Sequence, residues 1–212
     1  MDRPSPRAAY LLAASLPLAW IAVARASGQA LTAAQPSRLI ARYGAVDGTV
    51  FATHEWWRLL TSQWLHSKGP HMLFNALIVA VAGALIEREQ GIRRVLGLYL
   101  LGGLVGQIAG VIAYPDLVSS GASQAMLALC GAVLASPRVA RGRAAIAWGL
   151  VALATAVQLA LDLKVSGLPK AGHVAGLVVG LAYGRWRPLG ASPPAAASAR
   201  TDVASAPDHE KP

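Results

Sequence analysis

Long apolar runs separated by short polar stretches occupy most of the chain. Six runs lack Asp, Glu, Lys and Arg: Ala8–Ala24, His71–Ile86, Val95–Ala113, Ala122–Ala135, Ala144–Leu161 and Ala171–Gly184. The third and fifth are long enough to span a bilayer, the first is marginal, and the others are shorter. A short run alone could be a core helix of a soluble protein. Six in series favour an all-α membrane protein with a bundle of six transmembrane helices.

The composition supports the membrane assignment. Hydrophobic residues make up 55% of the 212 residues, charged residues 14%, and the mean hydropathy is +0.46, which is too apolar for an ordinary soluble domain. We therefore expect a single membrane domain over residues 8–189, after a short N-terminus at 1–7. The segment 190–212 is rich in Ala, Ser and Pro and is predicted to be a disordered tail. The lone cysteine, Cys130, cannot form an internal disulfide.

The basic residues indicate orientation rather than a nucleic-acid partner. The net charge is +9, but the arginines flank apolar runs instead of forming one basic face. The joints Glu87–Arg94 and Ser136–Arg143 hold three arginines each, and the joint Tyr114–Gly121 holds none. The positive-inside rule thus places the first two joints and both termini in the cytoplasm. Alternatively, the first run is a cleaved secretory signal, because Arg3 and Arg7 precede it and small residues follow it.

A long joint at 25–70 faces outward in this topology. It contains "THEWWRLLTSQWLHS", in which three tryptophans lie within nine residues. Tryptophan concentrates at membrane interfaces. We therefore predict that this stretch is an interfacial helix at the level of the lipid headgroups.

Polar residues inside the runs gather at one predicted depth. His71 and Asn75, Ser123 and His173 lie at the outer ends of the second, fourth and sixth runs. Each has a structural alternative: His71 and Asn75 share a helix face and could hold helices together, and a lone serine or histidine is commonly a packing residue. Together, however, a serine, a histidine and a donor pair match the requirements of acyl transfer.

Helix geometry adds two expectations about these residues. Gly180 and Gly184 fall within about 20° of His173 around a helix, so we expect the histidine to face a closely packed neighbour, the fourth helix. Ser123 begins its helix, where the first backbone amides lack internal partners. A serine there can attack a carbonyl while its own amide binds the oxyanion.

The motifs "HSKGPHMLFN", "GAS" and "AGHVAGLVVG", in this order, resemble the rhomboid family of intramembrane serine proteases. Trp57–Arg58 is similar to that family's Trp-Arg motif, and the resemblance extends over about residues 55–184. It implies that Ser123 is the nucleophile and His173 the general base. It also implies that His71, Asn75 and Gly121 lie on the oxyanion side and that His66 is a structural loop histidine.

The resemblance implies cleavage of transmembrane or membrane-anchored proteins in the bilayer by a Ser–His dyad, because no third acid occupies a matching position. We expect no cofactor and no metal; "THEWW" lacks the second histidine of a zinc motif. The expected location is a bacterial inner membrane. Two departures concern the site: Gln124 replaces the usual glycine after the serine, and Leu127 replaces an aromatic residue that would brace the histidine.

Two other functions fit parts of the pattern. A rhomboid-like protein that has lost activity would bind transmembrane helices without cutting them, although both Ser123 and His173 are present here. A transporter would carry polar residues at the midplane, but it would also show internal inverted repeats, and no repeat is evident in this sequence.

Overall fold

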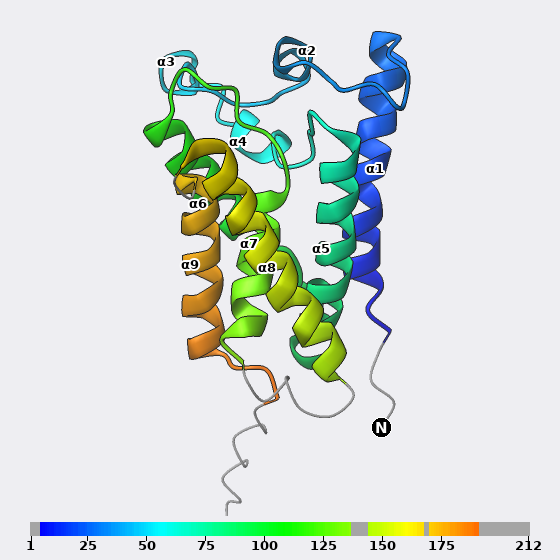
Figure 1. Cartoon of the computed structure of the whole chain (residues 1–212), viewed down its shortest axis with the longest axis vertical. Helices are drawn as coiled ribbons and strands as arrows, with labels where there is room; N and C mark the ends of the chain where they lie inside the picture. The colour runs from blue at the N-terminus through cyan, green and yellow to red at the C-terminus, as the bar shows by residue number, and fades with distance from the viewer. Residues whose placement is uncertain (1–4, 137–143, 168–169, 191–212) are drawn as a thin grey trace, which may run out of the picture.

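The computed structural model describes residues 5–136, 144–167 and 170–190, and this part of the chain is helical (Figure 1). Its long elements are α1 (Arg7–Ser27), α5 (Gly69–Gln90), α6 (Ile92–Ala113), α7 (Ser123–Leu134), α8 (Ala145–Ser166) and α9 (Ala171–Trp186). Within the described ranges, the strand-like pairing is one isolated bridge between Val46 and Ser119. The prediction of an all-α protein is confirmed there. Nearly all of the predicted tail, and the joint from residue 137 to 143, lie outside these ranges.

Four of the described helices could cross a bilayer by length and composition. They are α1, α5, α6 and α8, each with 21 or 22 residues in the apolar span. By contrast, α7 has 12 residues and α9 has 16. At 1.5 Å per residue these two helices are roughly 18 and 24 Å long, less than a hydrocarbon core of about 30 Å. The fold is therefore a membrane bundle with four candidate spans among the described residues. The lengths of α7 and α9 do not identify these two helices as further spans.

Helix α7 is short because it begins inside the bundle. The segment after α6 starts at the end of the molecule that carries α2, α3 and α4, and then runs down between the helices before α7 begins (Figure 1). Gly121 turns the chain with φ +117°, a value that favours glycine. Its N–H donates to the carbonyl of Ser62 at 2.9 Å. Every residue from Ser123 to Val133 is buried, so the helix start is enclosed by protein.

Glycines on α9 allow it to lie directly against α7. A Cβ atom on Gly176, Gly180 or Gly184 would overlap the backbone of α7. The predicted contact between the glycine face of this helix and the fourth run is confirmed. The contact also includes Gly176, which lies one turn nearer His173 than Gly180 does. The close contact holds His173 beside the start of α7.

The long joint does not form the single interfacial helix that its tryptophans suggested. It contains α2 (Ser37–Arg42) and two helices of four residues, α3 (Val50–Thr53) and α4 (Arg58–Thr61). His54 adopts a left-handed conformation with φ 57°, which ends α3. Arg58, the first residue of α4, donates to Glu55 at 2.8 Å and to the carbonyl of Ala41 at 2.7 Å. These bonds stabilise a folded loop instead of a continuous helix.

The three tryptophans of this loop have different environments. Trp56 and Trp57 are about half exposed, as expected for an interface. Trp64 instead packs on Tyr99 of α6, and its indole N–H donates to the Ser15 hydroxyl of α1 at 2.8 Å. The loop is therefore anchored to the bundle by Trp64.

Candidate active site

Ser123 and His173 form a direct hydrogen bond inside the bundle. The serine Oγ lies 2.7 Å from His173 Nε2, and both side chains are almost completely buried. Ser123 is the first residue of α7 and His173 is the third residue of α9, and the glycine contact described above fixes this pairing. The two residues that sequence reasoning singled out are thus brought together in a geometry that permits proton transfer between oxygen and nitrogen.

The pair opens onto a cavity of about 890 Å³. Its walls come from the first turns of α5 and α9, the last turns of α8 and the segment between α6 and α7. His71, Ser123, Asp162 and His173 all line it. A concave space with convergent polar groups is typical of a binding or active site.

Asn75 does not line this cavity, and its amide serves another histidine. Its Nδ2 atom donates to His66 Nε2 at 2.9 Å and lies 3.4 Å from His71 Nε2. The Ala122 N–H also donates to His66 Nε2, at 3.2 Å, while Nδ1 of the same ring donates to the Trp64 carbonyl at 3.2 Å. His66 therefore connects the long loop, α5 and the segment that leads into Ser123.

The ring of His66 is suited to this accepting role. Burial, with a smaller effect from the neighbouring His71, lowers the pKa of His66 to about 4. The ring is neutral at pH 7, so the single lone pair of Nε2 is shared by the two donors while Nδ1 donates its proton. The sequence suggested a structural histidine at this position, and the network gives that role specific partners.

Hydrogen-bond donors for a developing oxyanion are present next to Ser123. Among the described residues, the backbone N–H groups of Ser123 and Gln124 have no backbone acceptor outside α7, as expected for the first turn of a helix. His71 lines the same cavity, whereas the N–H of Gly121 is bonded to Ser62. The arrangement can bind an anionic oxygen through the helix amides with His71 nearby. Asn75 and Gly121 also hold the loop in place, through His66 and Ser62 respectively.

Gln124 is buried between helices, where it also forms part of the cavity wall. It is 6% exposed, and its Cβ and Cγ atoms fill the space left by Gly106 of α6 and Gly172 of α9. Its Oε1 atom lies 3.3 Å from the Ser123 hydroxyl, farther than the histidine nitrogen. The glutamine is thus accommodated by two facing glycines, and the Ser123–His173 bond forms in its presence.

Sequence reasoning missed Asp162. Its Oδ2 atom accepts a hydrogen bond from His173 Nδ1 at 2.6 Å, and the side chain is 2% exposed. The apolar run Ala144–Leu161 stops one residue before this aspartate and therefore excludes it. In the structure α8 continues to Ser166, which places Asp162 inside the helix. The sequence did contain a signal for this residue: a carboxylate directly follows an apolar run, at the same predicted depth as the serine and the histidine.

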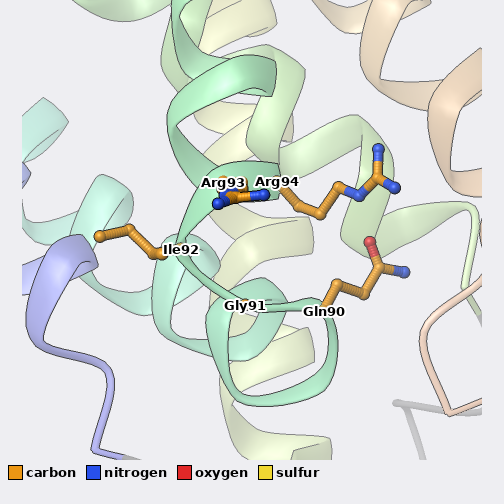
Figure 2. Close-up of a pocket in the computed structure, with 5 residues that line it drawn as sticks. All are labelled: Gln90, Gly91, Ile92, Arg93 and Arg94. Atoms are coloured by element: carbon orange, nitrogen blue, oxygen red, sulfur yellow. The ribbon is translucent and has the colours of Figure 1, made fainter.

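A second cavity, of about 520 Å³, lies at the opposite end of the bundle where α5 meets α6. It is lined by Gln90, Gly91, Ile92, Arg93 and Arg94, and Figure 2 shows the side chains of Gln90 and Arg94 extending to the same side. These lining residues include no nucleophile and no general base. Across the part of the chain that the structure describes, no group of three or more His, Cys, Asp or Glu residues is placed to hold a metal ion.

Comparison with known proteins agrees with the motifs. Residues 53–187 match the Rhomboid domain family. The chain is 34% identical over 139 residues to "Rhomboid protease GluP" of Bacillus subtilis, a match covering 65% of this chain and 27% of that protein. It is 37% identical over 99 residues to "RHOMBOID-like protein 7" of Arabidopsis thaliana, covering 46% and 32% of the two chains.

These matches span less than a third of either relative, and the names of the two relatives differ in whether they specify a protease. The matched residues nevertheless contain the helices that carry Ser123 and His173, together with the loop from residue 53 onward. This chain is a member of the rhomboid family.

Proposed function

We propose that the protein is an intramembrane serine endopeptidase that cleaves transmembrane or membrane-anchored proteins. The observation that carries the proposal is the 2.7 Å bond between Ser123 Oγ and His173 Nε2 at the wall of the large cavity. A hydroxyl becomes a competent nucleophile when a positioned base accepts its proton. Because the pair is enclosed by α7 and α9, substrate must reach it through the cavity.

In the proposed peptide hydrolysis, Ser123 supplies the nucleophile and His173 supplies the general base. His173 Nε2 accepts the Ser123 proton while Oγ attacks the scissile carbonyl, and the resulting oxyanion lies near the first amides of α7 and His71. The imidazolium then gives its proton to the leaving amine, which leaves an acyl-serine. Water next transfers a proton to His173 and attacks the acyl group, and return of that proton to Ser123 Oγ releases the carboxyl product.

The finer membrane arrangement belongs to the same proposal. All six long helices form the membrane domain, with α7 and α9 shielded by longer neighbours. Both termini and the joints Glu87–Arg94 and Ser136–Arg143 face the cytoplasm of a bacterial cell, so the cavity opens toward the outer side. The arginine distribution supports this orientation. The substrates are membrane-embedded helices.

Active-site labelling tests the chemistry directly. The purified protein in detergent should react with a fluorophosphonate and should cleave a model transmembrane substrate in proteoliposomes. Ser123→Ala should abolish both reactions. Ser136→Ala is the matched control, because Ser136 is also a buried serine, at the other end of α7, and its hydroxyl bonds the Ala132 carbonyl and the Leu189 N–H. Cleavage by Ser123→Ala at the unaltered rate would refute the assignment of the nucleophile.

The alternative is a rhomboid-like protein that binds transmembrane helices without cleaving them. Its supporting observation is the burial of Gln124 beside the serine, where the side chain offers the hydroxyl a second acceptor at 3.3 Å. Under this alternative, the unaltered protein would bind a transmembrane peptide but would show neither labelling nor cleavage. The labelling experiment therefore separates the two functions.

Orientation is tested with single cysteines in a Cys130→Ala background. A membrane-impermeant maleimide added to intact cells should modify Val118→Cys and leave Arg141→Cys unmodified until the cells are lysed. Modification of position 141 from outside would reverse the proposed topology.

A further inference from the structure

The carboxylate of Asp162 is held by three donors. His173 Nδ1 donates to Oδ2 at 2.6 Å, and the Lys170 backbone N–H donates to the same oxygen at 3.2 Å. On the other side, Gln158 Nε2 donates to Oδ1 at 3.4 Å. The first donor lies on α9, the second directly precedes α9, and the third lies one turn earlier on α8. A carboxylate bonded from three positions has a fixed orientation toward the imidazole.

This contact determines which nitrogen of His173 can act as a base. An ionised carboxylate only accepts hydrogen bonds, so Nδ1 must carry the proton it shares with Asp162. Nε2 is then unprotonated and presents its lone pair to the Ser123 hydroxyl at 2.7 Å. When Nε2 accepts the serine proton, the imidazolium forms next to a negative charge in a buried site, and this charge stabilises it.

We infer that Asp162 is a positioning residue that completes a Ser123–His173–Asp162 triad, in place of the serine–histidine dyad that the sequence suggested. The inference rests on the proposed protease function. Asp162 touches no substrate atom in this mechanism. It holds the imidazole in the reactive tautomer and balances its charge, and because it belongs to α8, the reactive geometry depends on three helices.

A purely structural role is the competing explanation. Asp162 also connects α8 to the start of α9, and breaking a buried contact of this kind can destabilise a protein. The two explanations differ in what a substitution changes. A structural role predicts loss of thermal stability with unchanged turnover per folded molecule, whereas a positioning role predicts loss of kcat at unchanged KM.

The test compares Asp162→Asn and Asp162→Glu with Glu87→Gln, all measured in proteoliposomes with one transmembrane substrate. Glu87 is the matched control, because it is the other buried carboxylate in the described bundle and its partners are backbone amides. Asp162→Asn should lower kcat by roughly 10²–10⁴-fold, the range expected when a triad aspartate is neutralised, with KM within about threefold. Asp162→Glu should restore part of the lost kcat. Glu87→Gln should leave kcat unchanged.

Turnover by folded Asp162→Asn within about threefold of the original would overturn the inference. Equal loss in Asp162→Asn and Asp162→Glu, with KM rising in parallel, would also overturn it. Neither result affects the proposed function, which fails only if the unaltered protein is inactive or Ser123→Ala remains active. The two conclusions are therefore tested separately.

A measurement on the unaltered protein avoids dependence on the folding of any variant. In protein carrying ¹⁵N-labelled histidine, NMR should show His173 protonated at Nδ1 and unprotonated at Nε2 at neutral pH, with the signal identified from its loss in His173→Ala. Protonation at Nε2 alone would place the hydrogen on the wrong nitrogen for both bonds and would overturn the inference.

Discussion

The two ends of the bundle each bury a carboxylate, and their partners differ. Near the cavity, Asp162 binds the side chain of His173, which in turn binds Ser123. At the opposite end, Glu87 of α5 accepts the backbone N–H groups of Ala8 at 3.1 Å and Ala9 at 2.7 Å. Asp162 is 2% exposed and Glu87 is 9% exposed. Burial alone therefore does not distinguish a functional carboxylate from a structural one.

The chemistry of the partner makes the distinction. Glu87 caps the start of α1, where amides lack helix partners and a negative charge is favoured, so its bonds stabilise the packing of α1 on α5. Asp162 instead bonds a titratable ring whose other nitrogen meets a hydroxyl at a cavity wall. The same contrast applies to the two cavities, because the one in Figure 2 contains arginines and a glutamine but no acid–base pair.

The largest expected effect on stability comes from removing the cap. Glu87→Ala would leave the N–H groups of Ala8 and Ala9 without their acceptor. Two charge-assisted bonds of about 1.5–3 kcal/mol each should together account for about 4 kcal/mol of unfolding free energy. Thermal unfolding in detergent should show a large drop in Tm, while kcat measured below that temperature stays unchanged. A kcat reduced as strongly as in Asp162→Asn would remove the distinction between the two ends.

The helices were predictable from sequence because the bilayer imposes long uncharged runs. The sixth run, Ala171–Gly184, corresponds to α9 at Ala171–Trp186, and the structure adds only its last two residues. Ser123 and His173 could be paired in advance because both occur at the same end of parallel segments. Their bond length, and their roles, did not follow from spacing.

Asp162 and the long loop were mispredicted for a common physical reason. Hydropathy identifies where a run stops, but a helix continues as long as its backbone bonds and side chains are satisfied. Asp162 is satisfied by His173 and Lys170, so α8 extends past the apolar run. In the loop, Arg58 bonds the carbonyls of Ala41 and Ala45, which are 17 and 13 residues away in sequence, and these bonds hold the loop folded. Such long-range partners are invisible in a local pattern.

The next largest expected effect is a loss of folding stability at low pH, which arises from His66. Its folded pKa is about 4 and its ordinary value is 6.5, so between these values the unfolded chain binds a proton that the folded protein excludes. The stability that the neutral ring provides is complete above pH 6.5 and falls as the pH drops toward 4. At about 1.36 kcal/mol per pKa unit, the loss by pH 4 is about 3 kcal/mol.

Thermal unfolding from pH 7.5 to 4.5 would reveal this dependence. His66→Gln should be less stable at pH 7.5 but should show a smaller decline as the pH falls. His71 lies beside His66, with the two ring centroids 5.9 Å apart, so His71→Gln is the matched comparison. An equal decline in His66→Gln and the unaltered protein would show that another group controls acid stability.

Gln124 provides a smaller effect at the catalytic end. Gln124→Ala would remove the atoms that fill the gap between Gly106 and Gly172, and the resulting void should lower the unfolding free energy by about 2 kcal/mol. The Ser123–His173 bond does not require this side chain, so fluorophosphonate labelling should change by less than about threefold. A loss of labelling by orders of magnitude in stable protein would place Gln124 in the catalytic machinery.

The smallest expected effect lies at the opposite end, at the boundary of the cavity in Figure 2. The Tyr183 hydroxyl of α9 donates to Gln90 Oε1 at 2.5 Å, and Gln90 Nε2 donates to the Arg187 carbonyl at 2.8 Å. Tyr183→Phe removes one of these two bonds between α5 and α9 and keeps the ring that packs against Trp186. A neutral hydrogen bond near the surface contributes about 1 kcal/mol, so Tm should fall by only a few degrees. Turnover should not change, because the glycine contact between α9 and α7 fixes His173 independently of this end. A Tyr183→Phe protein of normal stability with reduced kcat would mean that the far end of α9 controls the histidine, and that the two ends of the bundle are coupled.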